Sequence, residues 1–313
     1  MQDKKDFNFN DTDEELDLWE LLSVIFDGKW IIASITILFS VGIVFYSLSL
    51  PNIYQSKAIL VPVESSKSLS NNLNAYSGLA NLAGISLSSG GGYSISGKAI
   101  EKLNTLSFFE NNIMPNIFLP ELMAVESWDR ANNKLLFNPN IYDEVNKKWI
   151  RKFVYPQKQK PTAQEGFRRF KSNMSIVEDN KNGLITISIK HQSPYIAKKW
   201  TELIINQVNN FYKEKDKLEA EKALIYLNNQ IDKTSLTEIK QVIAGLLQQE
   251  TQKLTLIEAS ESYVFEYIDP PAVMEMKVGP RRSLICIIGA IVGGLFSIMI
   301  VLLKHYLFLF RKK

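Results

Sequence analysis

Hydrophobic and polar positions divide this chain into two uncharged apolar runs and a long polar segment between them. Residues 30–50 and residues 283–303 contain no charged side chain. At ~1.5 Å per residue, a helix of either run is ~31 Å long, about the thickness of a bilayer's hydrocarbon core. The pattern therefore predicts two transmembrane helices, at 30–50 and 283–303, with the polar residues 51–282 outside the lipid.

The first apolar run is predicted to be a permanent anchor rather than a cleaved signal peptide. The residues before it are acidic instead of basic, and the run is longer than the apolar region of a signal peptide. A capping box at Thr12–Glu15 predicts a short helix that leads into the span, with its apolar face toward the membrane surface. The alternative is that this apolar face contacts a cytoplasmic partner.

Two spans place both chain ends on one side of the membrane. Lys and Arg near the spans number seven on the terminal side and five on the loop side, a small bias toward cytoplasmic ends. Long loops translocate largely regardless of their charge. We therefore expect residues 1–29 and 304–313 in the cytoplasm and the domain 51–282 in the periplasm.

Short-range patterns predict the elements of the polar segment. Apolar and polar residues alternate along 184–190, and Asn182-Gly183 favours a tight turn, so 174–177 and 184–191 are predicted to form a β-hairpin. Strands at 53–63 and 263–268 are expected to pair, because each lies beside a span. Helices are expected over 98–112, 118–128 and, after a capping box at Thr162–Glu165, to about residue 172. The Ser, Asn and Gly-rich residues 65–97 are typical of a loop.

A long helix is predicted from Ser193-Pro194 to about residue 232, because no proline or glycine interrupts 195–244. Its residues 213–222 are charged nearly all round, which is typical of a helix that has left the body of its domain. A capping box at Ser235–Glu238 predicts a returning helix over 236–258.

Two sets of residues are candidates for functional contacts. The first is the charged part of the long helix, as a contact surface, with pairs four residues apart. The second is a GxxxG pattern in the second span, whose small residues let helices approach closely. The first set is Lys213, Lys215, Lys217, Glu219 and Glu221; the second is Gly289, Gly293 and Gly294.

Residues 141–171 are basic, with nine Lys or Arg against three Asp or Glu. Such a segment is able to bind an anionic sugar or a diphosphate head group. A solvated surface is the favoured interpretation, because the cations are scattered among prolines rather than gathered round glycines.

The pattern of reactive residues argues against an enzyme. His191 and His305 have neither metal-ligand spacing nor a nearby nucleophile, and both are interpreted as structural. Cys286 lies within the second span, and neither a phosphate-binding GxxxxGK[ST] loop nor a GxSxG nucleophile elbow occurs. We expect no catalytic residue, cofactor, metal or nucleic-acid partner. The overall charge of +3 and the 46% hydrophobic content are averages over the two apolar spans and the polar remainder, so they do not reveal the spans.

Several segments together resemble the Wzz-type chain-length determinants, the polysaccharide co-polymerases of Gram-negative inner membranes. The resemblance runs along nearly the whole chain, and its strongest piece is Gln252–Ser260. At Met274–Met276 the family tends to carry another proline, so this stretch departs from the pattern. The other segments are Glu15–Leu22, Gly28–Trp30, Tyr54–Ala58, Ser77–Gly84, Leu119–Ala124, Trp128–Asp129, Ser193–Pro194, Tyr263–Phe265, Ile268–Pro270 and Gly279–Arg282.

The resemblance implies an α+β periplasmic domain with a long protruding helix, anchored by two transmembrane helices in the inner membrane. It implies a homo-oligomeric ring, an octamer in such proteins, that acts without catalysis beside a Wzy-type polymerase. Its expected role is to set the chain length of lipid-linked polysaccharide, O-antigen or a related surface glycan. Under this resemblance the charged part of the long helix is the candidate length-setting surface.

Three alternatives are weighed against this function. An adaptor for a capsule or exopolysaccharide tyrosine kinase or exporter would often carry a nucleotide domain after the second span, where this sequence has ten residues. A membrane-anchored periplasmic sensor would need a cytoplasmic output module, for which both terminal segments are short. A glycan-active enzyme would need a catalytic constellation.

Overall fold

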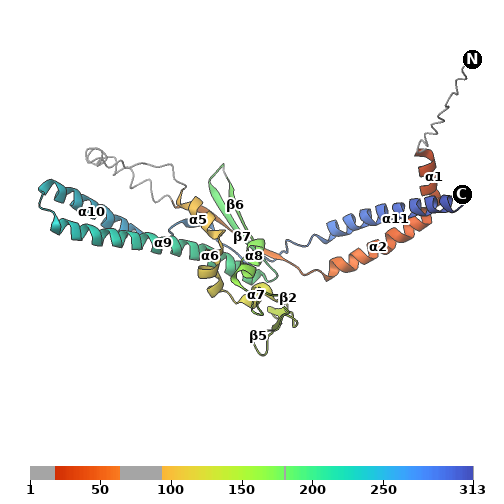
Figure 1. Cartoon of the computed structure of the whole chain (residues 1–313), viewed down its shortest axis with the longest axis horizontal. Helices are drawn as coiled ribbons and strands as arrows, with labels where there is room; N and C mark the ends of the chain where they lie inside the picture. The colour runs from red at the N-terminus through yellow and green to blue at the C-terminus, as the bar shows by residue number, and fades with distance from the viewer. Residues whose placement is uncertain (1–17, 64–93, 180, 313) are drawn as a thin grey trace, which may run out of the picture. The chain divides into compact units, whose positions relative to one another are not determined.

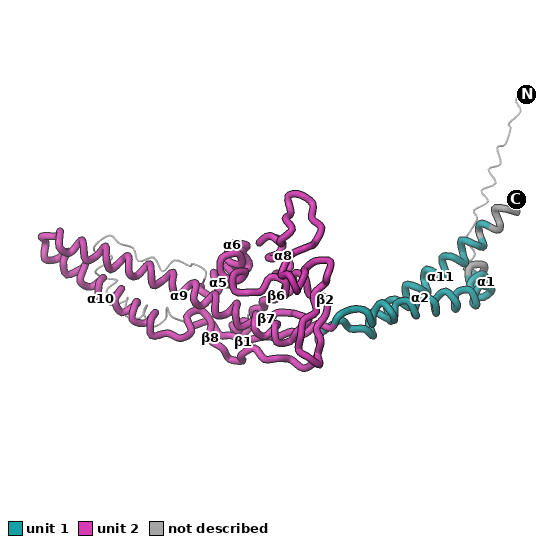
Figure 2. Tube along the Cα trace, turned by 90° about the horizontal axis from the view of Figure 1, so that it is seen from below, with its two compact units in different colours: residues 1–51, 279–313 teal, residues 52–278 magenta. Residues whose placement is uncertain are grey.

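The computed structural model describes residues 18–63, 94–179 and 181–312, which form two compact units. Unit 1 comprises residues 1–51 and 279–313, and unit 2 comprises residues 52–278 (Figure 2). The predicted capping box at Thr12–Glu15 and most of the expected loop at 65–97 lie outside the described residues.

The described residues of unit 1 form the helices α1 (Leu18–Asp27), α2 (Lys29–Ser49) and α11 (Arg282–Lys312). The helices α2 and α11 lie side by side (Figure 1) and cover the two apolar runs. Both are long and apolar enough to cross a bilayer, and most of their large side chains point outward, as with Leu38 at 75% exposed and Leu295 at 65%. Gly28 separates α1 from α2 where the chain passes against Val301.

Unit 2 is built on one four-stranded antiparallel sheet with the order β6-β7-β1-β8. The strands are β6 (Met174–Asp179), β7 (Leu184–His191), β1 (Tyr54–Pro62) and β8 (Phe265–Asp269). The pairing of β1 with β8 confirms the predicted contact between the two strands next to the spans. The β6–β7 pairing confirms the predicted hairpin, and Gly183 in its turn has a φ of 70°, which glycine adopts at little steric cost.

The core of unit 2 lies on one face of this sheet, where alternate residues of β1 and β7 are buried. Ala58 and Leu60 of β1 and Ile185, Ile187 and Ile189 of β7 are fully buried there. The first half of helix α9 (Pro194–Lys233) packs on the same core through Trp200, Ile204 and Val208, which are also fully buried. The helix α8 (Ala163–Asn173) contributes Phe170.

The helices α9 and α10 (Thr237–Ala259) form a hairpin that extends from the sheet (Figure 1). The predicted capping box at Ser235–Glu238 is wrong, because the residue before α10 is Leu236 and no side chain caps the helix. Residues 234–236 reverse the chain between the two helices, so Ser235 falls within the turn. At the start of α9, Pro194 occupies the first turn as predicted, but the Ser193 hydroxyl makes no capping bond.

Two predicted helices are divided or replaced in the structure. The segment 98–112 is α5 (Ile95–Leu103), α6 (Leu106–Phe108) and a π-helical turn (Phe109–Ile113), because the Thr105 hydroxyl accepts from the Phe108 amide and starts a new helix. After α7 (Leu119–Met123), the chain turns into β2 (Val125–Asp129), which pairs with β3 (Lys134–Phe137). A second small hairpin joins β4 (Tyr142–Asp143) to β5 (Lys148–Trp149).

Candidate functional site

The charged part of α9 is covered on one side by the C-terminal end of α10. The Lys213 ammonium donates to the carbonyls of Ser260 at 2.6 Å and Glu258 at 3.4 Å. These carbonyls end α10, where a cation satisfies unpaired oxygens and the negative end of the helix dipole. Within the same stretch Ala220 is fully buried.

A second set of contacts holds the same end of the α9–α10 hairpin. Lys217 pairs with Glu258 of α10 at 3.0 Å, instead of the predicted Glu221 on its own helix. The Tyr263 hydroxyl donates to the Asp216 carboxylate at 2.5 Å. Burial and this carboxylate raise the pKa of Tyr263 far above its ordinary value, so the phenol stays protonated as the donor. The candidate residues Lys213 and Lys217 therefore close the hairpin within one chain.

The candidates Lys215 and Glu219 on α9 face solvent beside this junction. Lys215 and Glu219 form the predicted pair at 3.8 Å, with both side chains more than half exposed. Exposed apolar side chains accompany them on the same hairpin, which is unusual for a solvated helix pair. These are Leu218, Ile225 and Tyr226 on α9 and Ile239, Val242 and Leu246 on α10.

Asn209, which is not among the predicted site residues, joins α9 to the sheet. Its side-chain oxygen accepts from the amides of Val264 and Phe265, and its nitrogen donates to the Phe265 carbonyl, each at 2.9 Å. The side chain is buried where β8 begins. An asparagine between Ile205, Val208 and Tyr212 on the buried face of the helix is the sequence signal that indicates such a contact.

The glycines of the second span contact the first span of the same chain. A Cβ at Gly289 would lie 2.6 Å from Ile43, and one at Gly293 would lie 2.9 Å from Phe39. Thr36 and Ser297 approach at 3.3 Å on the same face, so α2 and α11 run antiparallel. Gly294 is different, because the nearest atom to a Cβ there is the Thr36 hydroxyl at 4.0 Å.

His191 occupies a buried structural position in the core of unit 2. Its Nδ1 accepts from the Ser193 amide at 3.0 Å, so its Nε2 carries the proton and donates to the Glu121 carbonyl at 2.9 Å. Burial disfavours the charged form of both side chains, so it lowers the pKa of His191 and raises the pKa of the Glu121 carboxyl. The imidazole is thus held neutral between two backbone groups.

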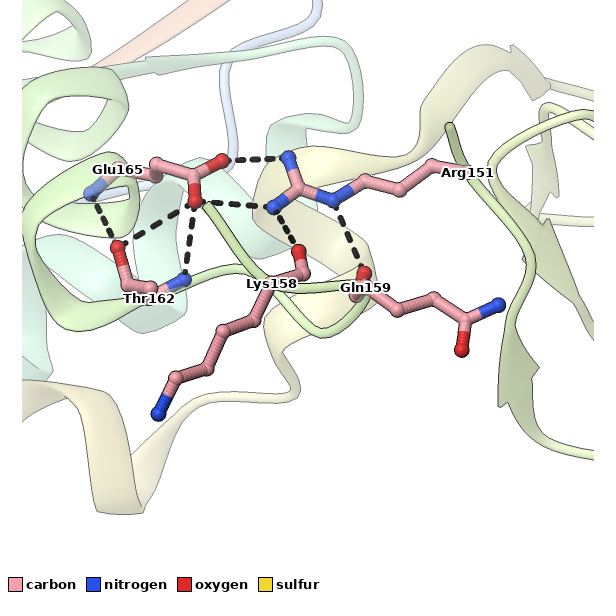
Figure 3. Close-up of polar contacts among 5 residues, drawn as sticks. All are labelled: Arg151, Lys158, Gln159, Thr162 and Glu165. Carbon is pink, nitrogen blue, oxygen red and sulfur yellow. Dashed lines mark hydrogen bonds and ion pairs between the residues drawn. The ribbon is translucent and has the colours of Figure 1, made fainter. Parts of the chain in front are cut away.

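In the basic segment 141–171, Arg151 makes contacts within the chain that hold the local fold (Figure 3). The Arg151 guanidinium makes a two-pronged ion pair with Glu165 and donates to the carbonyls of Lys158 at 2.7 Å and Gln159 at 2.9 Å. Glu165 and Thr162 form the predicted capping box of α8, which is confirmed. Hydrogen bonds from Arg151 lower the pKa of Glu165.

The acidic and sulfur side chains do not gather into a metal site within the described parts of the chain. No group of three or more His, Cys, Asp or Glu in residues 18–63, 94–179 and 181–312 has the geometry to hold an ion. Cys286 lies in α11 as a free thiol.

One family model matches the first part of the chain. Residues 14–112 match the family model for Wzz, described as chain length determinant protein. Four of the resembling segments lie within this range: Glu15–Leu22, Gly28–Trp30, Tyr54–Ala58 and Ser77–Gly84. No protein with a curated description matches the sequence.

Two solved structures align with the chain over much of its length. One is described as a full-length bacterial polysaccharide co-polymerase, with 15% identity, a TM-score of 0.42, and coverage of 95% of this chain and 100% of that chain. The other is a fragment of WzzB, the polysaccharide co-polymerase from Salmonella Typhimurium, with 15% identity, a TM-score of 0.29, and coverage of 73% and 100%.

Proposed function

We propose, from the match of residues 14–112 to the family model for Wzz, that the protein sets the chain length of a surface polysaccharide. The regulated polymer is O-antigen or a related glycan, and the protein acts beside a Wzy-type polymerase on lipid-linked chains. The family match is the observation that carries the proposal. In this role the protein regulates a polymerase and makes no glycosidic bond itself.

The proposed location is the inner membrane, with α2 and α11 as spans. Their antiparallel packing supports a two-pass arrangement, because Leu50 and Arg282 lie at one end of the pair and Gly28 and Val301 at the other. In the proposed orientation both termini are cytoplasmic and unit 2 is periplasmic. The acidic N-terminal flank does not oppose this orientation, since Asp and Glu contribute little to it.

The proposed active form is a homo-oligomeric ring. Support comes from the exposed apolar side chains of the α9–α10 hairpin, which a monomer would leave in water at a cost of about 25 cal/mol per Å². Lys215, Glu219 and Glu221 are proposed to lie at or beside the contacts between protomers. Lys213 and Lys217 contribute indirectly, by holding the hairpin that presents this surface.

Deletion of the gene, followed by gel separation of the cell's surface polysaccharides, tests the function. The expected result is loss of the modal band distribution while polymer is still made, and its return with a plasmid copy of the wild-type gene. Unchanged modal banding in every surface glycan of the deletion strain would contradict the proposal. Loss of all polymer would indicate that the protein is required for synthesis itself.

A further inference from the structure

Residues 144–160, here called the basic loop surface, combine exposed apolar side chains with lysines. Val145 is 90% exposed, Val154 78% and Tyr155 91%, and Ile150 and Phe153 are about half exposed. Glu144 is the one acid in this range, and it pairs with Lys134 at 3.3 Å. The exposed lysines of the surface are Lys147, Lys148, Lys152, Lys158 and Lys160.

Two preformed turns hold these apolar side chains out in solvent. The Asp143 carboxylate accepts from the amides of Val145 and Asn146 at 3.0 Å, which fixes the β4–β5 turn with Val145 at its tip. Arg151 grips the Lys158 and Gln159 carbonyls and so closes the loop that carries Val154 and Tyr155 (Figure 3). Preorganised loops lose little conformational entropy when they bind.

The composition of the surface fits a lipid interface better than a sugar site. Sugars are held by convergent polar groups in concave sites, whereas Val145 and Val154 are aliphatic side chains on protruding turns. Apolar and aromatic tips flanked by lysines are typical of segments that lie in the interface of an anionic membrane. We propose that residues 144–160 dock unit 2 onto the anionic surface of the bilayer, with Val154 and Tyr155 entering the head-group region.

The position of the surface within unit 2 is consistent with this partner. Tyr54 follows the end of α2 by five residues, a reach of at most ~18 Å, and its ring packs on Trp128 of β2 at 5.4 Å. In the same group of small hairpins, Phe137 contacts Tyr142 at 5.8 Å and Tyr142 contacts Trp149 at 5.2 Å. The pairing of β2 with β3 joins these two groups of aromatic contacts, so the basic loop surface is connected to β1, the strand that follows the first span.

The inference rests on the membrane anchoring in the proposed function and not on control of chain length. Its test uses the full chain with Cys286→Ser, reconstituted in vesicles, carrying Tyr155→Cys labelled with an environment-sensitive fluorophore. The matched control is Val177→Cys, at an exposed apolar residue of β6 outside the α9–α10 hairpin. Vesicles are made of neutral phosphatidylcholine or of phosphatidylethanolamine with anionic phosphatidylglycerol, and both contain a lipid with a shallow nitroxide quencher.

In anionic vesicles we expect quenching at position 155 to exceed that at position 177 by about threefold or more, because only the former contacts lipid. Raising salt from about 0.1 M to 1 M shortens the Debye length from ~10 to ~3 Å and is expected to reduce the difference. The variant Lys147→Glu, Lys148→Glu, Lys152→Glu is expected to reduce it in the same way. Because these lysines are exposed, the variant is expected to keep its fold, and circular dichroism verifies this.

Equal quenching at positions 155 and 177 would overturn the proposal. Strong quenching at 155 that is identical in neutral vesicles and insensitive to salt would also overturn it, because anionic lipid would then play no part. Protection of the label by a soluble acidic polysaccharide, without quenching by lipid, would assign the surface to a glycan instead. None of these readouts depends on polysaccharide banding, so the two proposals fail separately.

Discussion

Asn209 shows how a single polar residue on a buried helix face joins α9 to the sheet. Substitution by alanine would leave the amides of Val264 and Phe265 buried without their acceptor. We expect Asn209→Ala to lower the free energy of unfolding by about 3 kcal/mol, since each unsatisfied buried donor costs roughly 1–3 kcal/mol. The measurement is denaturant unfolding of the full chain in detergent micelles, followed by circular dichroism.

The adjacent Asn210 provides the control for this prediction. Its side chain is exposed on the same helix, and Asn210→Ala changes helix propensity in the same direction. We expect Asn210→Ala to leave the unfolding midpoint within experimental error. Similar losses for both variants would show that the effect belongs to α9 in general and not to the link with β8.

His191 is expected to make the stability of unit 2 depend on pH. Its folded pKa lies below the ordinary value of 6.5, so the unfolded chain takes up more protons below that pH. Stability from this residue is therefore complete above pH ~6.5 and is lost as the pH falls toward the folded pKa. Glu121 acts with the opposite sign, because its raised pKa favours protonation in the folded state.

The variant His191→Gln separates the two contributions. It removes the titrating ring, so the difference in unfolding midpoint between pH 7.5 and pH 5.5 should become smaller than in the wild type. A lower midpoint at both pH values is expected as well, because the contacts with Ser193 and Glu121 are disturbed. A pH dependence identical to that of the wild type would contradict the assignment.

Among the elements, the pair α2–α11 depends on close approach at two glycines. Gly289→Ala and Gly293→Ala place a methyl group within 3 Å of Ile43 or Phe39, and overpacking of this kind costs about 1–3 kcal/mol. We expect both variants to lower the thermal unfolding midpoint of the full chain in micelles. Gly294→Ala is the matched control and is expected to have little effect, because its nearest neighbour is 4.0 Å away. A loss of stability confined to Gly294→Ala would place the contact on the other face of α11.

In the α9–α10 hairpin, some charged residues hold the two helices together and others face outward. Lys213→Met removes the donor to the α10 carbonyls and is expected to lower the thermal midpoint. Lys215→Glu reverses an outward charge and is expected to keep the midpoint while it shifts the modal length of the polysaccharide in a complemented deletion strain. Both variants are expected to insert into the membrane as the wild type does. An insertion defect, or a Lys215→Glu strain with wild-type banding, would contradict this division.

At the scale of the whole molecule, the proposed topology is tested by reporter fusions. Alkaline phosphatase fused after Lys313 is expected to be inactive, and a fluorescent protein at the same place is expected to fluoresce, because both report a cytoplasmic end. Phosphatase inserted after Gly183, in the β6–β7 turn, is expected to be active. Active phosphatase after Lys313 would invert the orientation, and activity at both positions would exclude a two-pass arrangement.

Features that depend on residues close in sequence were predictable for this chain. The mixed helix-and-strand fold class, with a long helix and two apolar helices near the ends, is confirmed. So are the β6–β7 hairpin with its Asn182-Gly183 turn and the capping box of Thr162 and Glu165. The turn and the capping box depend on contacts between residues a few positions apart. Each apolar run is by itself long enough to span the bilayer.

Contacts between residues far apart in sequence were decided by the tertiary structure. Lys217 pairs with Glu258 rather than Glu221, because α10 returns along α9 and brings that carboxylate to 3.0 Å. Gly289 and Gly293 obtain their partners Ile43 and Phe39 only when α2 and α11 pack together. The uncharged runs and alternating strands were therefore determined by the sequence alone. The partners of the charged and small residues required the fold, because contact energies depend on distance in space rather than along the chain.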